Sequence, residues 1–177
     1  MDNTNLTAEQ WVEIYDNGGF GGHGSGTGSL LENNYELIKI FDNFILENNI
    51  QNLLDLGCGI MQWIPFTETY DKLDYTGVDG ASNIVKTNIE KFSSPTKKFI
   101  CCDLFKFECE DEFDLILCKD VFQHNQMQEL KDGLAQKIGS LKAKHKMIIL
   151  PTNYDFPYTY IQKIDYQSDE PKTIIIF

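Results

Sequence analysis

The amino-acid sequence predicts an α/β fold built on a doubly wound, mostly parallel sheet with helices on both faces. Short apolar runs alternate along the chain with segments whose apolar residues recur at helical spacing, as expected for successive βαβ units. A glycine pair, Gly57 and Gly59, directly follows the first apolar run, and aspartates end the next two, at Asp79 and Asp103. Because βαβ connections share one handedness, these residues are expected to meet at the carboxyl ends of the strands, where such sheets bind ligands.

The N-terminal part of the chain, residues 1–48, is expected to form a glycine-rich cap followed by a helix. The segment 18–29 contains seven of the thirteen glycines. Beyond it, apolar residues recur with helical periodicity, which predicts a helix over 31–48 with Ser29 as its N-cap.

Strands and helices then alternate through residues 51–151, the predicted cofactor-binding core. The strands are expected at 51–56, 74–79, 97–102, 113–118 and 146–151. The helices between them are expected at 60–70, 82–92 and 124–141. A last strand is expected at 172–177, within a short C-terminal segment (152–177) that is either abbreviated or cut short. The whole chain, 1–177, is interpreted as a single domain.

The charge balance and the cysteine content narrow the function classes. The chain carries 15 basic and 27 acidic residues, a net charge of −12, and such a surface repels nucleic-acid backbones and anionic membranes. No apolar stretch approaches the roughly 20 residues needed to cross a bilayer. The five cysteines lack CxxC spacing, so neither a disulfide framework nor a zinc site is indicated. We therefore expect a cytoplasmic monomer or homodimer with a small-molecule substrate and without a metal, nucleic-acid or membrane partner.

The run DLGCG, residues 55–59, ends the first predicted strand and is the strongest indication of a ligand site. Glycines at this point let the backbone turn tightly and let a ligand approach the main chain. The N–H groups that begin the following helix suit a negatively charged group. Nicotinamide-dependent enzymes use the same device, but their pattern needs a third small residue where this chain has Gln62. An acid two residues before the first glycine instead suits a cationic amino group, such as the amino-acid end of S-adenosylmethionine.

Two further aspartates fit the rest of that cofactor. Asp79 lies twenty residues after Gly59, a spacing at which a carboxylate accepts hydrogen bonds from both ribose hydroxyls. Asp103, at the end of the third predicted strand, is suited to accept a hydrogen bond from the adenine amino group. Acids at three successive strand ends therefore predict S-adenosylmethionine as the cofactor.

The segments DLGCG, YTGVD, CCDLF and FDLILCKDVFQH resemble the Rossmann-like, seven-stranded (class I) methyltransferase superfamily over residues 51–151. The resemblance implies that the cofactor is bound by Asp55, Gly57, Cys58 and Gly59 at its methionine end, Asp79 and Gly80 near the ribose, Asp103 and Leu104 at the adenine, and Lys119 after the fourth strand. Members usually have a helix and a two-stranded hairpin after the fifth strand, so the C-terminal part is expected to be abbreviated. With YDNGGF and GSGTGS upstream, the pattern is similar to small bacterial-type members, in which the glycine-rich segment is expected to close over the cofactor.

The segment 119–124 follows the fourth predicted strand, where the cofactor is expected to meet the methyl acceptor. His124 has an ordinary pKa of about 6.5 and is a candidate general base for a hydroxyl acceptor, and Asp120 is a second candidate. A purely structural role for His124, at the start of the following helix, stays open. In-line positioning alone can also suffice for methyl transfer.

Three functions stay open on these residues. The first is an enzyme that transfers a methyl group from S-adenosylmethionine to an oxygen or nitrogen of a small molecule, with a sugar or sugar nucleotide as candidate acceptors. The second is a methyltransferase-fold binding or regulatory module without turnover, suggested by the short C-terminal part. The third is a nicotinamide oxidoreductase, against which the missing third glycine argues.

Overall fold

The computed structural model describes residues 7–19, 24–124, 128–154, 156, 159–168 and 170–177, and its strands form one seven-stranded sheet. The strands are β1 (Asn52–Leu56), β2 (Asp74–Asp79), β3 (Lys97–Cys101), β4 (Phe113–Lys119), β5 (Ala143–Pro151), β6 (Gln162–Gln167) and β7 (Pro171–Ile176). The α-helices are α1 (Ala8–Asp16), α2 (Tyr35–Glu47), α3 (Ser82–Phe92) and α4 (Gln128–Ser140). The 3₁₀ turns are η2 (Thr27–Ser29), η3 (Leu31–Asn33), η4 (Ile64–Phe66), η5 (Tyr70–Lys72) and η6 (Phe122–His124).

The sheet has the strand order β3-β2-β1-β4-β5-β7-β6. Strands β1 to β5 run parallel to one another, and Leu54 of β1 pairs with Thr76 on one side and with Ile116 on the other. Among the described strands only β7 runs in the opposite direction, because it is antiparallel to both of its neighbours, β5 and β6. The predicted doubly wound, mostly parallel α/β sheet is therefore confirmed. The strand order changes direction beside β1, which favours a ligand crevice at the carboxyl ends of β1 and β4.

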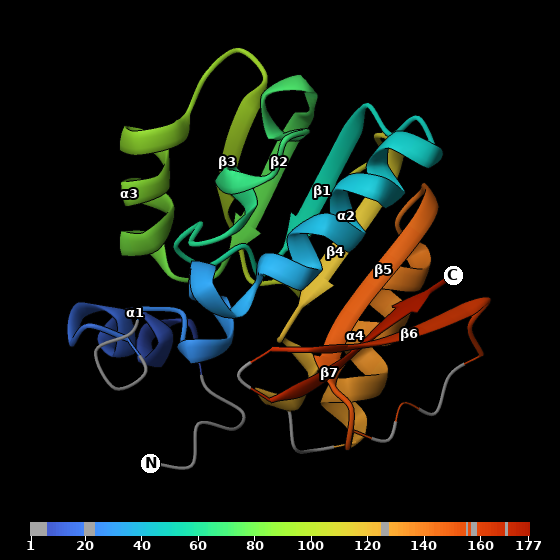
Figure 1. The fold of residues 1–177 in the computed structure, drawn as a ribbon. Helices are drawn as coiled ribbons and strands as arrows, with labels where there is room; N and C mark the ends of the chain where they lie inside the picture. Colours follow the sequence, from blue (N-terminus) through green and yellow to red (C-terminus); the bar gives the residue numbers. More distant parts are fainter. Residues whose placement is uncertain (1–6, 20–23, 125–127, 155, 157–158, 169) are drawn as a thin grey trace.

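Apolar side chains cover both faces of the sheet. On one face, Leu37 and Phe41 of α2 join Val85 of α3 in a single buried cluster. On the other face, Leu134 and Ile138 of α4 belong to a second cluster. Strand β4 is buried along its whole length because helices pack on both sides of it. Figure 1 shows α1 below α3, on the side of the sheet toward which the carboxyl end of β2 points.

The helix predicted over 60–70 is not formed. Two 3₁₀ turns, η4 and η5, connect β1 to β2 instead. Met61 has a left-handed backbone with φ of 57°, and Pro65 at the start of η4 has no N–H to donate. The apolar residues of this stretch, Trp63 and Ile64 among them, are buried in the core without helical structure. The helix N-terminus that we expected directly after Gly59 is therefore not part of the site.

The start of α2 also differs from the prediction. The helix begins at Tyr35, because η2 and η3 occupy the preceding residues, and its N-cap is Asn34 rather than Ser29. The Asn34 side-chain amide donates to the carbonyls of Gly28 (2.9 Å) and Leu30 (2.7 Å), which fixes the chain entering the helix. The Ser29 hydroxyl instead donates to the carbonyl of Ser25 at 3.4 Å.

Two elements were missed by the sequence analysis, α1 and β6. Helix α1 begins with a capping box, in which the Thr7 N–H donates to Gln10 Oε1 at 2.8 Å and the Gln10 N–H donates to Thr7 Oγ1 at 3.3 Å. Strand β6 pairs with β7 along its whole length, so the C-terminal hairpin is complete. The abbreviation concerns the segment before it, where no helix is found among the described residues 152–154, 156 and 159–161.

The remaining predicted elements differ from the observed ones only near their ends. Strand β5 starts earlier than predicted, at Ala143, and β7 spans Pro171–Ile176. Of the predicted helix 124–141, α4 forms Gln128–Ser140, while residues 125–127 lie outside the described part of the chain. No helix in the described residues is both long enough and apolar enough to span a bilayer.

Candidate active site

A cavity of about 490 Å³ lies at the carboxyl ends of β1, β2 and β4. Every site residue predicted from the sequence lines it: Asp55, Gly57, Cys58, Gly59, Asp79, Gly80, Asp103, Leu104, Lys119, Asp120 and His124. The structure therefore brings together the three strand-end aspartates that the sequence analysis expected to share a cleft. Among the described residues, no cluster of three or more His, Cys, Asp and Glu side chains is arranged to hold a metal ion.

The glycine loop after β1 is held in a conformation that only glycine adopts without strain. Gly57 has a φ of 81° and Gly59 a φ of 55°, both in the left-handed region. A Cβ atom on Gly57 would lie 2.5 Å from the Cγ2 atom of Val121, which follows β4. The N–H groups of Gly57 and Cys58 donate to the Val78 carbonyl at 2.8 and 3.2 Å, so the loop is anchored to β2.

Asp55 is a buried carboxylate at the end of β1. Its Oδ2 atom accepts a hydrogen bond from the Tyr75 hydroxyl at 2.7 Å. Burial raises the pKa of Asp55 to about 7, with the negative charge of Asp79 adding to the shift, while the Tyr75 hydrogen bond and the positive charge of Lys119 oppose it. A cationic ligand group beside this carboxylate would therefore gain from neutralising a poorly solvated negative charge.

Asp79 connects the end of β2 to the glycine loop. Its Oδ2 atom accepts from the Gly59 N–H at 3.0 Å, and its Oδ1 atom accepts from the Ala81 N–H at 3.0 Å. Burial raises the pKa of Asp79, although the backbone hydrogen bonds from Ala81, Gly59 and Gly80 lower it. Each carboxylate oxygen has a second lone pair, so both can still accept a hydrogen bond from a ligand hydroxyl.

Asp103 lies at the more open end of the cavity, after β3. Its Oδ1 atom accepts from the Phe105 N–H at 2.9 Å, and its Oδ2 atom lies 3.7 Å from the Lys106 ammonium. The Lys106 side chain is 81% exposed, so this ion pair contributes little. Leu104 packs toward the glycine loop, where a Cβ atom on Gly57 would be 3.8 Å from its Cδ1 atom. Asp103 and Leu104 thus offer a carboxylate beside an apolar surface.

Lys119 and Asp120 form an ion pair where β4 ends. The buried Lys119 ammonium lies 2.6 Å from Asp120 Oδ2 and donates to the Gly28 carbonyl at 2.8 Å, which ties the cap to β4. Although burial alone would raise it, the positive charges of Lys119 and Lys172 hold the pKa of Asp120 at about 2. Asp120 is therefore an anion over the whole physiological pH range and a weak base.

His124, in η6, is the second predicted catalytic residue. Its ring meets the Trp11 ring of α1 edge to face, with centroids 5.4 Å apart. Burial lowers the pKa of His124 below its ordinary value; Asp120 raises it and Lys172 lowers it further. The imidazole is therefore neutral near pH 7 and able to accept a proton.

Three residues of the cavity wall were not among the predicted site residues: one in the glycine-rich segment (Ser25), one in α1 (Tyr15) and one after β1 (Gln62). The Ser25 Oγ atom accepts from the Ile60 N–H at 3.0 Å and lies 3.3 Å from the Tyr15 hydroxyl. The Ser25 N–H donates to Gln62 Oε1 at 3.2 Å. Ser25, Tyr15 and Gln62 all line the cavity. No local pattern identifies them, because their partners are far away in the sequence. Residues 20–23 of the predicted cap lie outside the described part of the chain.

Comparisons with known proteins agree with this geometry. A model of the methyltransferase domain matches residues 53–144. The fold is similar to magnesium protoporphyrin IX methyltransferase from Synechocystis PCC 6803 with bound S-adenosylmethionine, with 14% identity over 80% of this chain and 77% of that chain and a TM-score of 0.63. It is also similar to the N-methyltransferase NodS from Bradyrhizobium japonicum WM9, with 13% identity over 81% of this chain and 97% of that chain and a TM-score of 0.58.

The methyltransferase domain of bacterial CtHen1 is a third similar structure, with 12% identity over 81% of this chain and 98% of that chain and a TM-score of 0.65. Identities this low establish a shared fold and nothing finer. No curated protein sequence matches the chain. The family model, in contrast, covers just over half of the residues. The chain therefore belongs to the methyltransferase-domain family, which confirms the predicted family and enzyme class, and the structural similarity confirms the predicted Rossmann-like fold.

Proposed function

We propose that this enzyme transfers a methyl group from S-adenosylmethionine to an oxygen or nitrogen of a small, polar molecule that enters the cavity beside His124. The observation that carries the proposal is the shared cavity, in which three strand-end carboxylates and an imidazole that is neutral near pH 7 line the same walls. Its volume of about 490 Å³ lies within the roughly 300–1,000 Å³ common for small-molecule sites.

The residues present fit S-adenosylmethionine. The Asp55 carboxylate suits the ammonium group, and the glycine loop, where a Cβ atom on Gly57 would collide with Val121, leaves the main chain open to close approach. Asp79, with Gly80, suits the ribose hydroxyls, while Asp103 and Leu104 suit the polar edge and the face of the adenine. Cys58, Gly59 and the Lys119 ammonium complete the methionine end. The bound cofactor supplies a methyl group on a cationic sulfur, which a nucleophile displaces.

We assign the general base to His124 rather than to Asp120. An unprotonated ring nitrogen of His124 can take the proton of an acceptor hydroxyl as the oxygen becomes a nucleophile. The Asp120 oxygens already accept from Lys119, Lys172 and Gln123, and its low pKa makes it a poor proton acceptor. An amine acceptor that is already neutral needs only positioning.

The acceptor class follows from the cavity wall and the overall charge. Trp11, which contacts His124, lines the cavity together with polar residues of the N-terminal part, and this mixed wall favours a sugar or sugar nucleotide among polar acceptors. The net charge of −12 argues against nucleic-acid and anionic-membrane partners. A cytoplasmic, monomeric or homodimeric enzyme is the setting we propose.

Calorimetric titration with S-adenosylhomocysteine tests the cofactor site. The wild-type chain is expected to bind in the micromolar range, about −8 kcal/mol, and Asp79→Asn is expected to weaken binding at least tenfold. Asp74→Asn is the matched control, because Asp74 is an exposed residue at the opposite end of the same strand. Absence of wild-type binding at millimolar ligand would defeat the assignment.

A labelled methyl donor tests the acceptor class. The wild-type chain is incubated with sugars, sugar nucleotides and small amines, and His124→Gln is compared on each acceptor that is methylated. The rate of methyl transfer to hydroxyl acceptors is expected to fall much more in this variant than the rate of transfer to neutral amines. Binding of S-adenosylhomocysteine without transfer to any acceptor would favour the binding or regulatory module.

A further inference from the structure

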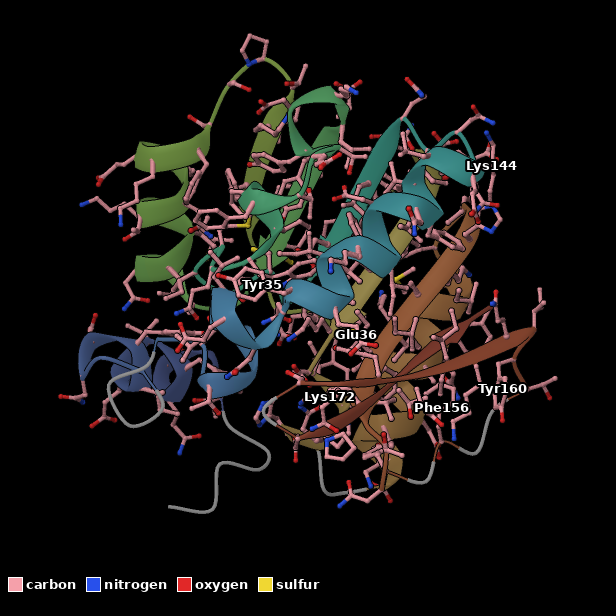
Figure 2. The ribbon with its side chains drawn as sticks, in the orientation of Figure 1. Tyr35, Glu36, Lys144, Phe156, Tyr160 and Lys172 are labelled. Atoms are coloured by element: carbon pink, nitrogen blue, oxygen red, sulfur yellow. The ribbon has the colours of Figure 1, made fainter. Side chains whose placement is uncertain are left out.

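A buried lysine on the C-terminal hairpin, Lys172, contacts Asp120 of the cavity wall from behind that wall. Lys172, on β7, has a side chain that is only 3% exposed. Its ammonium lies 2.9 Å from Asp120 Oδ1 and 2.9 Å from Glu170 Oε1. Figure 2 labels Lys172 on the C-terminal hairpin, and Glu36, near the start of α2, accepts a hydrogen bond from the N–H of Gln167, the last residue of β6. Lys172 is not part of the cavity wall, whereas Asp120 is.

Asp120 is the point at which the chain leaves β4 and turns into η6. Its φ of 57° is uncommon for a residue other than glycine, so neighbouring contacts have to hold it. The Asp120 N–H donates to the Ile149 carbonyl at 2.9 Å. The Asp120 Oδ2 atom accepts a hydrogen bond from Lys119, and its Oδ1 atom accepts from both Gln123 and Lys172. Lys172 is the only one of these side-chain partners that comes from another strand, so it fixes the turn relative to the sheet.

This turn determines the position of two parts of the cavity wall. Val121 follows directly and packs against Gly57 in the glycine loop. Three residues further on, the His124 N–H donates to the Val121 carbonyl at 3.2 Å, and the His124 ring packs on Trp11. A displacement of Asp120 would therefore move both the cofactor loop and the imidazole.

We propose that Lys172 is a positioning residue for methyl transfer, whose ammonium holds Asp120 so that the turn after β4 presents His124 to the cavity. The proposal rests on the proposed function, because it assigns His124 to the acceptor side. Lys172 itself touches neither cofactor nor acceptor.

The charges around His124 support this assignment. In the described part of the chain, Asp120 at the end of β4 and Lys172 on β7 are charged groups that act on the imidazole, while Trp11 of α1 packs against it without a charge. Burial lowers the pKa of His124 first, and Lys172 lowers it further against the opposing effect of Asp120. Although burial opposes it, Asp120 and Glu170 raise the pKa of Lys172, so the lysine stays charged. Lys172 thus adds to the effect of burial on the His124 pKa while its ammonium contacts Asp120.

The test is an NMR titration of the histidine side chains in the full chain, with the His124 signals assigned by their loss in His124→Gln. Lys172→Met is expected to raise the His124 pKa by roughly half a pH unit, because a nearby positive charge is lost. Lys172→Arg keeps the charge and is expected to restore the wild-type value. Lys163→Met is the matched control, because Lys163 is a half-exposed lysine of the neighbouring strand β6 whose ammonium lies 3.7 Å from Asp165 Oδ1, and it is expected to leave the His124 pKa unchanged.

Two further measurements keep the proposal testable if Lys172→Met does not fold. Asp120→Asn removes the opposing charge and is expected to lower the His124 pKa. In the wild-type chain, the buried Lys172 ammonium is expected to give a slowly exchanging ¹⁵N signal with a hydrogen-bond coupling to the Asp120 carboxyl carbon. An unchanged His124 pKa in a folded Lys172→Met or Asp120→Asn chain, or a wild-type Lys172 without that coupling, would overturn the proposal. Calorimetry with S-adenosylhomocysteine distinguishes the two proposals. If the wild-type chain binds this ligand but the His124 pKa does not change, the proposed role of Lys172 fails while the cofactor site stands.

Discussion

At the scale of single residues, Asp55 and Gly57 are expected to influence what the cavity binds in opposite ways. Asp55 brings a charge to a place where water cannot solvate it well, so a cationic ligand group is attracted there. Gly57 brings no side chain, so the backbone approaches both Val121 and the ligand. Each property gives a prediction that one substitution tests.

The affinity for S-adenosylhomocysteine is expected to depend on pH through Asp55. Because the pKa of Asp55 is raised to about 7, its carboxylate becomes protonated below that pH and loses its attraction for the ligand ammonium. The dissociation constant is expected to rise about tenfold per pH unit below 7 and to level off above 8. Calorimetry from pH 5.5 to 8.5 measures it. Asp55→Asn is expected to bind weakly at every pH, and a wild-type constant that does not change would contradict the assignment.

Gly57→Ala is expected to destabilise the protein by about 1–3 kcal/mol, because alanine is strained at a φ of 81° and its Cβ atom meets Val121. Urea unfolding measures the change. Adding Val121→Ala is expected to recover the steric part and leave the backbone strain. Gly139→Ala, in α4, is the control: nothing lies within 4 Å of its Cβ position, so it is expected to be neutral or stabilising. Equal losses at the two glycines would argue against this account.

At the level of elements, the sequence was informative wherever a pattern is local. The apolar runs of β1 and β4 predicted buried parallel strands. The aspartates near the ends of β1 and β2 were predicted to share one cavity, and both line it. The helix predicted over 60–70 was wrong, because tertiary burial of Trp63 and the left-handed Met61 outweigh helical propensity there. Helix α1 could have been predicted, because Thr7 and Gln10 have the spacing of a capping box.

Other parts of the site had no local pattern to reveal them. Lys172 meets Asp120 across 52 residues of sequence, and Ser25 meets Ile60 across 35. Such contacts depend on how the sheet and the cap pack in three dimensions. The residues at the strand ends were predictable because the parallel topology fixes where they meet. The contacts that hold those residues in place, such as Lys172 with Asp120, were not predictable.

Docking of the cap on the glycine loop is expected to depend on Ser25. Ser25→Ala leaves the Ile60 N–H without its 3.0 Å acceptor, which costs about 1 kcal/mol. Hydrogen exchange at the Ile60 amide is expected to accelerate about fivefold, and S-adenosylhomocysteine to bind more weakly. Ser140→Ala, at the exposed end of α4, is the control and is expected to leave both unchanged. Unaltered Ile60 exchange in Ser25→Ala would show that the cap is held by other contacts.

For the whole molecule, the dominant property is the net charge of −12. We expect repulsion among the 27 acidic residues to oppose the compact state more than the exposed ion pairs support it. The strongest ion pairs, those of Asp120, are buried and therefore little screened by salt.

Thermal stability is expected to increase with salt. Raising sodium chloride from about 10 to 150 mM shortens the screening length from roughly 30 to 8 Å and relieves the repulsion. A gain of about 1 kcal/mol would raise the melting temperature by about 2–4 °C for a chain of this size. Scanning calorimetry measures the shift, and a fall in the melting temperature would mean that exposed ion pairs dominate.

The position of β7 between β5 and β6 has a consequence for protein synthesis. Among the described strands, β7 is the last to leave the ribosome, yet it lies inside the sheet and pairs with a neighbour on each side. Until it emerges, the outer edge of β5 is left open and Asp120 lacks one of its cations. The contact between Lys172 and Asp120 can therefore form only after β7 has left the ribosome, and a nascent chain arrested before Pro171 would expose the unpaired edge of β5.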